Sequence, residues 1–304
     1  MAGKTDTRCS TLARALAEPL PGTAPVGDRL VCVEHLGAWP RTVDRHPDPA
    51  VAGLAERARA AGRKLLLIRR PGRRPPPDSP RTVLLADTGP GAVRVGRLVV
   101  DGPSELASVP LDDARAGDPV TRPLVLVCTH GTRDLCCAVD GLALARGLAE
   151  TEADGVWECS HLGGHRFAPT ALVLPSGYLY GRLDLASAIA ARKAAGQGEV
   201  EHAHCRGRAA WKPAGQVAEL AVRARTGLRD VDALLVTRID GPEVGPDGAE
   251  VGGSAVVVTG PGGAAWEVRV EPTPGPARPT SCGGALERMA PLVATEVREL
   301  ARAR

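Results

Sequence analysis

Aromatic residues are scarce in this chain of 304 residues, which contains one phenylalanine, two tyrosines and four tryptophans. Proteins that bind single-stranded nucleic acids stack the bases on aromatic side chains, and so few rings provide no such surface. The formal net charge of +3 comes from 38 basic and 35 acidic residues, so the sequence also lacks the strong basic excess of a nucleic-acid-binding protein. We therefore expect no nucleic-acid partner.

Long hydrophobic runs are also missing. Nowhere do about 18 uncharged apolar residues follow one another, which is the length that a membrane-spanning helix needs. The N-terminal residues 1–22 lack the apolar segment of a secretory signal peptide. We therefore expect a cytoplasmic protein without a membrane partner, and in that compartment its eight cysteines are expected to be reduced thiols or metal ligands.

Three motifs that are typical of enzymes are absent. The chain has no C-x-x-C pair, which thioredoxin-like thiol oxidoreductases normally carry, so direct thiol chemistry at Cys128 or Cys137 is disfavoured. It has neither a P-loop nor a Rossmann glycine pattern, so nothing supports a nucleotide cofactor. We expect an electron carrier more than a catalyst, and an oxidoreductase if the chain is an enzyme.

Hydrophobic periodicity predicts an α/β protein in three parts, without an internal sequence repeat. Residues 1–118 form a smaller N-terminal α/β module, residues 119–208 a thioredoxin-like domain, and residues 209–304 a C-terminal α+β module. In the first part we expect strands at 29–39, 64–72 and 82–89 and a helix at 49–63. In the last part we expect a helix at 214–227, strands at 232–239, 255–260 and 265–272, and a final helix near 285–304.

The middle part reads as strand, helix, strand, followed by strand, strand, helix. Its strands are expected at 124–128, 155–159, 170–177 and 178–183, and its last helix at 184–197. The first helix is expected to place the following residues on one face: Leu135, Val139, Leu142, Ala145 and Ala149. A βαβ unit joined to a ββα unit in this order is the layout of a thioredoxin-like layer.

Four side chains with metal-binding chemistry stand where these elements end or begin. Cys128 ends the first strand, Cys137 begins the helix, and His161 and His165 lie in the loop after the next strand. Because the carboxyl ends of such strands carry ligand-binding loops at one edge of the sheet, we expect all four at one rim. Two thiolates and two imidazoles make a four-coordinate set, and the helix N-terminus favours the thiolate of Cys137.

A glycine pair separates the two histidines. Gly163 and Gly164 can adopt the positive φ values that other residues resist, so the sequence predicts a sharp turn that directs both imidazoles toward one point. Isolated cysteines are more often small apolar core residues, which is the expectation for Cys32 and Cys159.

The residue types alone leave the bound group open. Zinc accepts two cysteines and two histidines tetrahedrally, whereas a [2Fe-2S] cluster uses the same ligand types across two irons. A competing ligand set has the C-x-H form of a Rieske first motif, at Cys128 with His130 and at Cys159 with His161. No matching C-x-x-H follows about 16 residues later, so this second set is the weaker hypothesis.

The stretches CTHGTRDLCC at 128–137 and HLGGHRFAPTALVLPSGYLYGRL at 161–183 resemble the sucrase/ferredoxin-like family, whose core is a thioredoxin-like ferredoxin. This resemblance implies a [2Fe-2S] cluster held by Cys128, Cys137, His161 and His165, acting in electron transfer or redox sensing with an unidentified redox protein partner. It leaves open whether Cys136 or Cys137 is the ligand. A structural zinc-binding interaction module with the same ligands is the alternative.

Two histidine ligands have a consequence for such a cluster. Neutral imidazoles in place of anionic thiolates make reduction easier, so we expect a potential above the plant-type value of about −400 mV and toward the Rieske range of about −150 to +300 mV. The outer N–H groups couple reduction to proton uptake. Arg133 and Arg166 are candidates for stabilising the reduced charge, and Phe167 is expected in the core.

Overall fold

The computed structural model describes residues 8–72, 75–76, 79–152, 154–241 and 253–301. Its helices are α1 (Cys9–Ala15), α2 (Pro49–Ala60), α3 (Leu142–Thr151), α4 (Leu185–Gly196) and α5 (Pro213–Thr226), with short turns η1 (Val43–Arg45), η2 (Pro103–Ser108), η3 (Cys137–Gly141), η4 (His165–Phe167) and η5 (Pro261–Gly263). None of these helices has both the length and the apolar composition needed to span a bilayer.

The strands of the large sheet are β1 (Arg29–Glu34), β2 (Lys64–Arg69), β3 (Arg81–Asp87), β4 (Arg94–Val100), β5 (Asp118–Pro119), β6 (Leu124–Cys128), β7 (Val156–Cys159), β8 (Ala171–Leu174), β9 (Tyr178–Tyr180) and β10 (Cys205–Arg208). Those of the smaller sheets are β11 (Leu235–Asp240), β12 (Ser254–Thr259), β13 (Ala265–Pro272), β14 (Arg278–Pro279), β15 (Leu286–Glu287) and β16 (Leu292–Glu299). The expected α/β class is confirmed.

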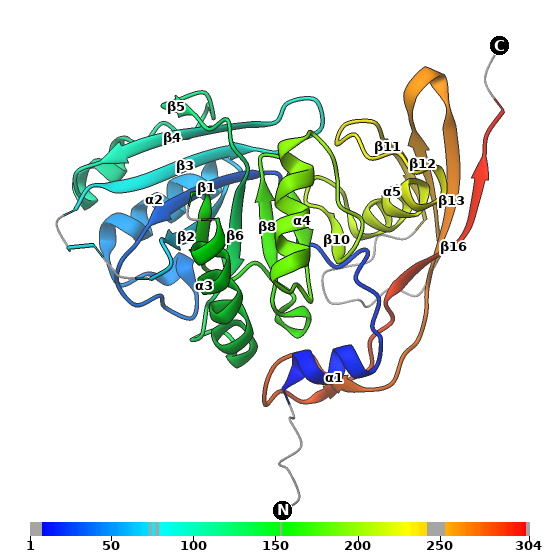
Figure 1. Cartoon of the computed structure of the whole chain (residues 1–304), viewed down its shortest axis with the longest axis horizontal. Helices are drawn as coiled ribbons and strands as arrows, with labels where there is room; N and C mark the ends of the chain where they lie inside the picture. The colour runs from blue at the N-terminus through cyan, green and yellow to red at the C-terminus, as the bar shows by residue number, and fades with distance from the viewer. Residues whose placement is uncertain (1–7, 73–74, 77–78, 153, 242–252, 302–304) are drawn as a thin grey trace, which may run out of the picture.

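One ten-stranded sheet runs through the first two expected parts, in the order β10-β9-β8-β6-β7-β2-β1-β3-β4-β5 (Figure 1). The predicted boundary between residues 118 and 119 falls within β5, and both β5 and the following strand β6 belong to this sheet. The two halves meet where β2 and β7 pair antiparallel, with Ile68 opposite Cys159.

The two halves of this sheet repeat one topology. In the first half β1 and β2 are parallel and joined through α2, and β3 and β4 add antiparallel strands on the other side of β1. In the second half β6 and β7 are parallel and joined through α3, and β8 and β9 add antiparallel strands in the same way. The expected βαβ and ββα units at 119–208 are therefore both present. The first half of the sheet, from β1 to β4, has the same strand order.

Helices cover one face of the sheet and a shared core covers the other. Helix α2 packs on β2, helix α3 on β6 and β7, and helix α4 on β8. The opposite face carries one hydrophobic cluster with members from both halves, including Leu66 and Ile68 from β2 and Trp157 and Cys159 from β7. Cys128 belongs to this cluster, so the candidate site lies at the end of the core that the two halves share.

Local sequence signals explain the helix ends. The carboxylate of Asp48 accepts a hydrogen bond from the backbone N–H of Ala50, and Pro49 takes the first helical position of α2. Helix α5 ends at Gly227, which adopts a left-handed conformation with φ of 73°.

The prediction that Leu135 and Val139 share the buried face of the first helix of the middle part was wrong. Their exposed fractions are 53% and 49%, and the buried positions of α3 are Leu144, Ala145 and Leu148. The cause is η3, a π-helical turn that precedes α3. A π turn contains more residues than an α turn, so it shifts the phase of the apolar face.

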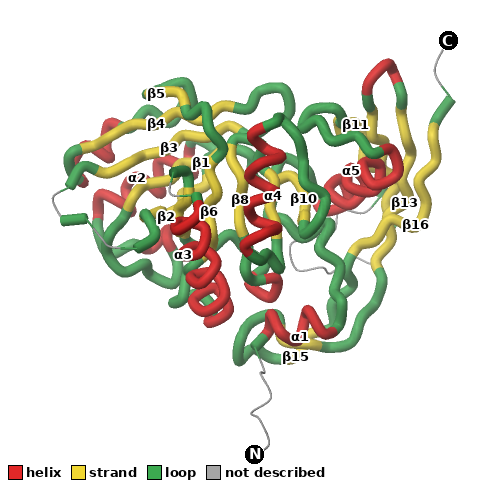
Figure 2. The backbone as a smooth tube through the Cα atoms, viewed as in Figure 1, coloured by secondary structure: helices red, strands yellow, loops and turns green. Residues whose placement is uncertain are grey.

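The predicted final helix was also wrong, because the chain forms β15 and β16 there. Strand β16 pairs antiparallel with β13 along its whole length and closes a four-stranded sheet in the order β11-β12-β13-β16. Pro291 blocks a continuous helix, and the β-branched residues Val293, Thr295 and Val297 alternate along β16. Helix α5 covers this sheet, as Figure 2 shows.

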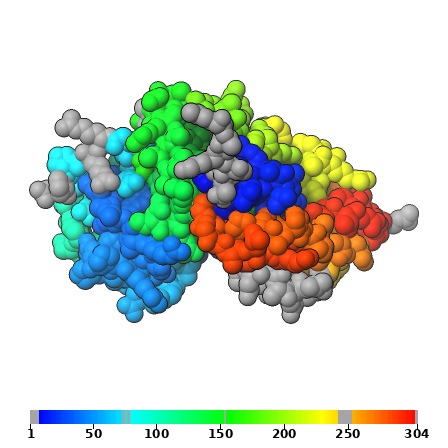
Figure 3. Space-filling model, turned by 90° about the horizontal axis from the view of Figure 1, so that it is seen from below, coloured from blue at the N-terminus to red at the C-terminus, as the bar shows by residue number. Residues whose placement is uncertain are grey.

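The N-terminal segment and the segment around β14 meet beside the middle part. Helix α1 lies against β14 and η4, so N-terminal and C-terminal segments adjoin on the face seen in Figure 3. Buried Glu18 accepts hydrogen bonds from Arg166 Nε at 2.9 Å and Arg278 Nε at 2.7 Å. This pair of contacts ties the N-terminal segment and β14 to the histidine loop.

Candidate metal centre

Three of the four expected ligands lie together. Cys128 is the last residue of β6, and its Sγ lies 3.4 Å from Sγ of Cys137 at the start of η3. Nδ1 of His161 lies 4.0 Å from the same Cys128 sulfur. One donor atom from each of these three residues lies within 4.8 Å of the others, and both thiols are buried.

The spacing of the two sulfurs resembles that of two ligands on one metal ion. At a metal–sulfur distance of about 2.3 Å, tetrahedral geometry places two thiolates about 3.8 Å apart. A disulfide would bring the sulfurs to about 2.05 Å. The observed 3.4 Å between Cys128 and Cys137 is therefore close to the metal value.

His165 is placed beside this group instead of inside it. Its ring centroid lies 5.2 Å from that of His161, and its Nε2 faces Oδ2 of Asp134 at 3.5 Å. Both ring nitrogens are buried, and neither has a hydrogen-bond partner among the described residues. Burial lowers the pKa of His165, which favours the neutral imidazole that coordinates metals.

The expected turn between the histidines is present. Gly163 and Gly164 have φ values of 82° and 71°, and η4 begins directly after them. A Cβ atom at Gly164 would meet the guanidinium group of Arg206. Glycine is thus required there both for its backbone conformation and for the space that Arg206 occupies.

Arg206 supports this loop and was not singled out by the sequence analysis. It follows the buried Cys205 in β10. The fully buried Arg206 donates to Gly163 O and to Thr23 Oγ1, both at 3.0 Å. Burial lowers the pKa of Arg206 to about 9. Only the tertiary structure reveals this role of Arg206, because an arginine beside Gly207 does not contribute to any hydrophobic pattern in the sequence.

His130 holds His161 through the backbone. Its Nδ1 accepts a hydrogen bond from the N–H of His161 at 3.0 Å, and its Nε2–H donates to Pro40 O at 2.9 Å. Both ring nitrogens are therefore engaged, which disfavours the Rieske-type set that used His130. Trp39 packs edge-on against this ring with centroids 5.8 Å apart, so the first half of the sheet helps to build the site.

The two buried thiols are expected to ionise at different pH. A hydrogen bond with Cys137 and a further one with His161 lower the pKa of Cys128 despite its burial. The hydrogen bond with Cys128, together with burial, raises the pKa of Cys137. Cys128 is thus the thiol that loses its proton first, and metal binding would displace the proton of Cys137.

The remaining predicted residues have structural roles. Arg166 pairs with Glu18 and lies over the ring of Phe167, 4.5 Å from its centroid. Phe167 is fully buried, as expected for the core. Cys32 and Cys159 are buried in the shared cluster, which confirms their reading as small core residues. Arg133 is partly exposed at the start of the cysteine-bearing turn.

Cys136 points away from this centre. It lies with Cys9, Asp134 and Cys282 in a second group whose donor atoms are within 4.8 Å of one another. The structure therefore separates the two adjacent cysteines that the sequence left unresolved, and it brings Cys137 to Cys128.

Comparison with known proteins adds one finding to this geometry. The family model described as sucrase/ferredoxin-like matches residues 20–207, which is more than half of the chain. No curated protein and no solved structure matches the chain. The matched range contains the Cys128, Cys137 and His161 group, and we conclude that the chain belongs to the sucrase/ferredoxin-like family.

Proposed function

We propose that this protein carries a [2Fe-2S] cluster on Cys128, Cys137, His161 and His165 and acts in electron transfer or redox sensing. The observation that supports this most strongly is the pair of buried sulfurs 3.4 Å apart, with two imidazole rings beside them. The family membership agrees with this proposal.

The donor chemistry fits such a cluster. Two thiols can bind one iron and two imidazoles the other, as in Rieske centres. The ring nitrogens of His165 are buried without hydrogen-bond partners among the described residues, a costly arrangement unless a ligand satisfies them. With Nε2 of His165 facing Asp134, its Nδ1 is the nitrogen left to coordinate.

When bound, the cluster supplies a one-electron redox couple. The protein's own residues orient the ligands: His130 holds the backbone of His161, and Arg206 holds Gly163 O. Asp134 can accept the outer N–H of His165, the carboxylate–histidine pairing that raises ligand basicity in metal sites. A proton at Nε2 of His165 is thereby stabilised.

Access for a redox partner is expected on the histidine side. Cys128 and Cys137 are buried, whereas His161 and His165 are partly exposed. An electron therefore has its shortest route from solvent through the imidazoles, and we propose that a redox protein docks over this loop.

Zinc is the second candidate for these ligands, and one observation favours it. Donor atoms of Cys128, Cys137 and His161 lie within 4.8 Å of one another, which suits a single ion. In this case the site is structural and the protein serves as an interaction module.

Anaerobic purification of the full chain tests the two candidates. We expect visible absorption bands that bleach with dithionite, together with two irons and two sulfides per chain. Cys137→Ser should abolish them, whereas the control Cys205→Ser, at a lone buried cysteine, should retain them. A colourless protein with one zinc that disappears in Cys137→Ser would contradict the cluster and support zinc.

A further inference from the structure

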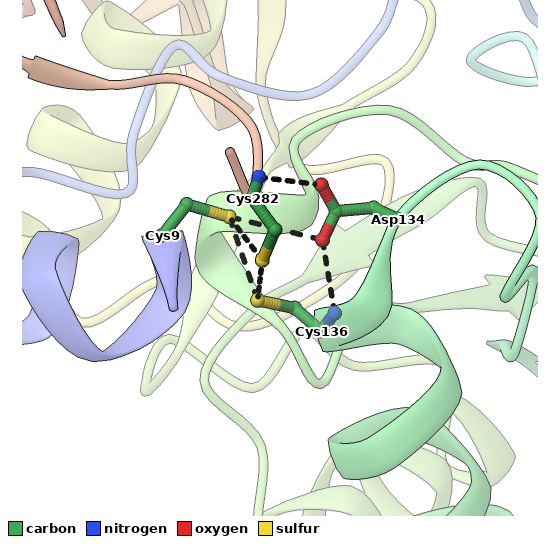
Figure 4. Close-up of side chains that lie close together, drawn as sticks. All are labelled: Cys9, Asp134, Cys136 and Cys282. Atoms are coloured by element: carbon green, nitrogen blue, oxygen red, sulfur yellow. Dashed lines mark hydrogen bonds between the residues drawn. The ribbon is translucent and has the colours of Figure 1, made fainter. Parts of the chain in front are cut away.

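A second set of metal-binding side chains converges from three separate segments (Figure 4). Cys9 is the first residue of α1, Cys136 directly precedes η3, and Cys282 lies between β14 and β15. The Sγ of Cys136 is 3.4 Å from that of Cys9 and 3.1 Å from that of Cys282. The third side of this triangle, between Cys282 and Cys9, is 3.7 Å.

This triangle is not the geometry of a disulfide. A disulfide joins one pair of sulfurs at about 2.05 Å and leaves a third thiol unpaired. Here the three separations are similar, and they approach the value of about 3.8 Å for thiolates that share one tetrahedral ion. A [4Fe-4S] cluster would place each cysteine on a different iron and hold the sulfurs further apart, and a [2Fe-2S] cluster would bring at most two of the three sulfurs onto one iron.

Asp134 supplies a fourth donor. Its side chain is 1% exposed, and its two carboxylate oxygens accept backbone hydrogen bonds from Cys136 at 2.9 Å and from Cys282 at 3.0 Å. Oδ1 lies 3.8 Å from Sγ of Cys9, near the separation of about 3.6 Å expected for oxygen and sulfur on one zinc ion. Each oxygen retains a lone pair, so the carboxylate can orient two ligands and also bind.

The segments that carry these donors are held together by other contacts. Ser10 Oγ donates to Asp140 Oδ2 at 3.1 Å, which fastens the start of α1 to η3. The Glu18 contacts with Arg166 and Arg278 fasten the C-terminal segment to the same place. The thiols therefore lie in a prebuilt site, where α1 adjoins the segment that carries Arg278 and Cys282.

We propose that Cys9, Cys136 and Cys282, with Asp134 as the fourth ligand, bind a structural zinc ion. Four protein ligands leave no open coordination position, which is typical of structural zinc. The ion ties helix α1 and the segment between β14 and β15 to the turn that carries Cys137. Cys9 and Cys282 lie outside the range that the family model matches, and the proposal does not depend on the iron-sulfur cluster.

Zinc content and affinity of the full chain test this proposal. The wild type should retain one zinc, and Cys282→Ser should weaken zinc affinity at least about 100-fold in competition with a chromophoric chelator, since even outer-shell partners are worth 10–100-fold. Cys128→Ser should lose the visible chromophore and keep this zinc, which separates failure of one centre from failure of the other. Cys205→Ser is the matched control and should behave as wild type.

Alkylation of the wild-type chain provides a test that needs no variant. A strong chelator should expose Cys9, Cys136 and Cys282 to iodoacetamide, identified by peptide mass, while zinc protects them. The isolated buried thiols Cys32 and Cys205 should stay unlabelled in both states. Unchanged zinc affinity in Cys282→Ser, a native disulfide within the triangle, or iron and sulfide on these cysteines would overturn the zinc assignment.

Discussion

Cys136 and Cys137 are adjacent in the chain, yet their sulfurs belong to different groups. Sγ of Cys136 lies 3.1 Å from Cys282, and Sγ of Cys137 lies 3.4 Å from Cys128. Asp134 reaches both groups, because it binds the N–H of Cys136 and faces Nε2 of His165. One short turn of backbone thus positions ligands for two sites, and a change at one site should be detectable at the other.

Replacement of His161 by cysteine should retain a cluster and lower its potential. A thiolate adds a negative charge that opposes reduction, so the potential should fall by on the order of 100 mV toward the plant-type value. A redox titration followed by visible absorption measures this shift in potential.

In the wild type the potential should also fall as pH rises above the pKa of the oxidised centre, because the reduced centre binds its protons more tightly. A wild-type potential independent of pH would exclude histidine ligation.

Gly164→Ala should destabilise the protein and reduce cluster occupancy. Alanine at φ of 71° costs about 1–2 kcal/mol, and its Cβ would also displace the guanidinium of Arg206. Gly198→Ala is the matched control, because Gly198 has φ of 72° and open space around it. Urea unfolding should show a loss larger than the control by about 1–3 kcal/mol. Equal losses in the two variants would show that the Arg206 contact is unimportant.

His130→Asn should leave iron and sulfide in place while the protein unfolds more easily. Asparagine can still accept from the N–H of His161 but loses the donor to Pro40 O, so a cost of about 1–3 kcal/mol is expected. Metal analysis and urea unfolding measure the two effects. Loss of the chromophore from a folded His130→Asn protein would make His130 a ligand and revive the Rieske-type set.

Stability should decrease in mild acid because of His35. Burial and the neighbouring His46 lower the pKa of His35 to about 4; Arg81 and Arg69 lower it further by smaller amounts, and Asp48 opposes the shift. The unfolded chain therefore binds this proton near pH 6.5 and the folded chain does not, so stability is full above that pH and is lost as pH falls toward 4.

The size of this effect follows from the shift. Between pH 7 and pH 5 the neutral His35 should account for about 2 kcal/mol of lost stability, measured by urea unfolding at both pH values. His35→Gln removes the titrating group, so the difference in unfolding free energy between pH 7 and pH 5 should be smaller by that amount. A variant as acid-sensitive as the wild type would refute the role of His35, whose ring packs edge-on against His46.

The proximity of Cys128, Cys137 and His161 could be predicted from the sequence because strand ends are predictable. Cys128 follows a run of buried apolar residues, and Cys137 and His161 stand at the next two element ends, so one topological rule brings them together. The position of His165 relative to the others depends on loop packing, which spacing does not determine.

The second group could not be predicted in this way. Cys9 and Cys136 are 127 residues apart, and Cys136 and Cys282 are 146 apart, in segments with little periodic pattern. Their meeting depends on the tertiary contacts of Glu18 and Arg278. The failed helix at 285–304 has a similar cause, since the open edge of β13 offers backbone partners that outweigh the local helix preference of its Ala, Leu, Glu and Arg residues.

The junction of β2 with β7 has a meaning for the origin of the chain. These strands hold equivalent positions in two halves with the same strand order, and they pair antiparallel. Such pairing is the contact that a twofold axis makes between two copies of one domain. Duplication and fusion of an ancestral homodimer would build this sheet in one step. In such an arrangement the first half, through Pro40 and Trp39, supports His130 beside the candidate ligands of the second half.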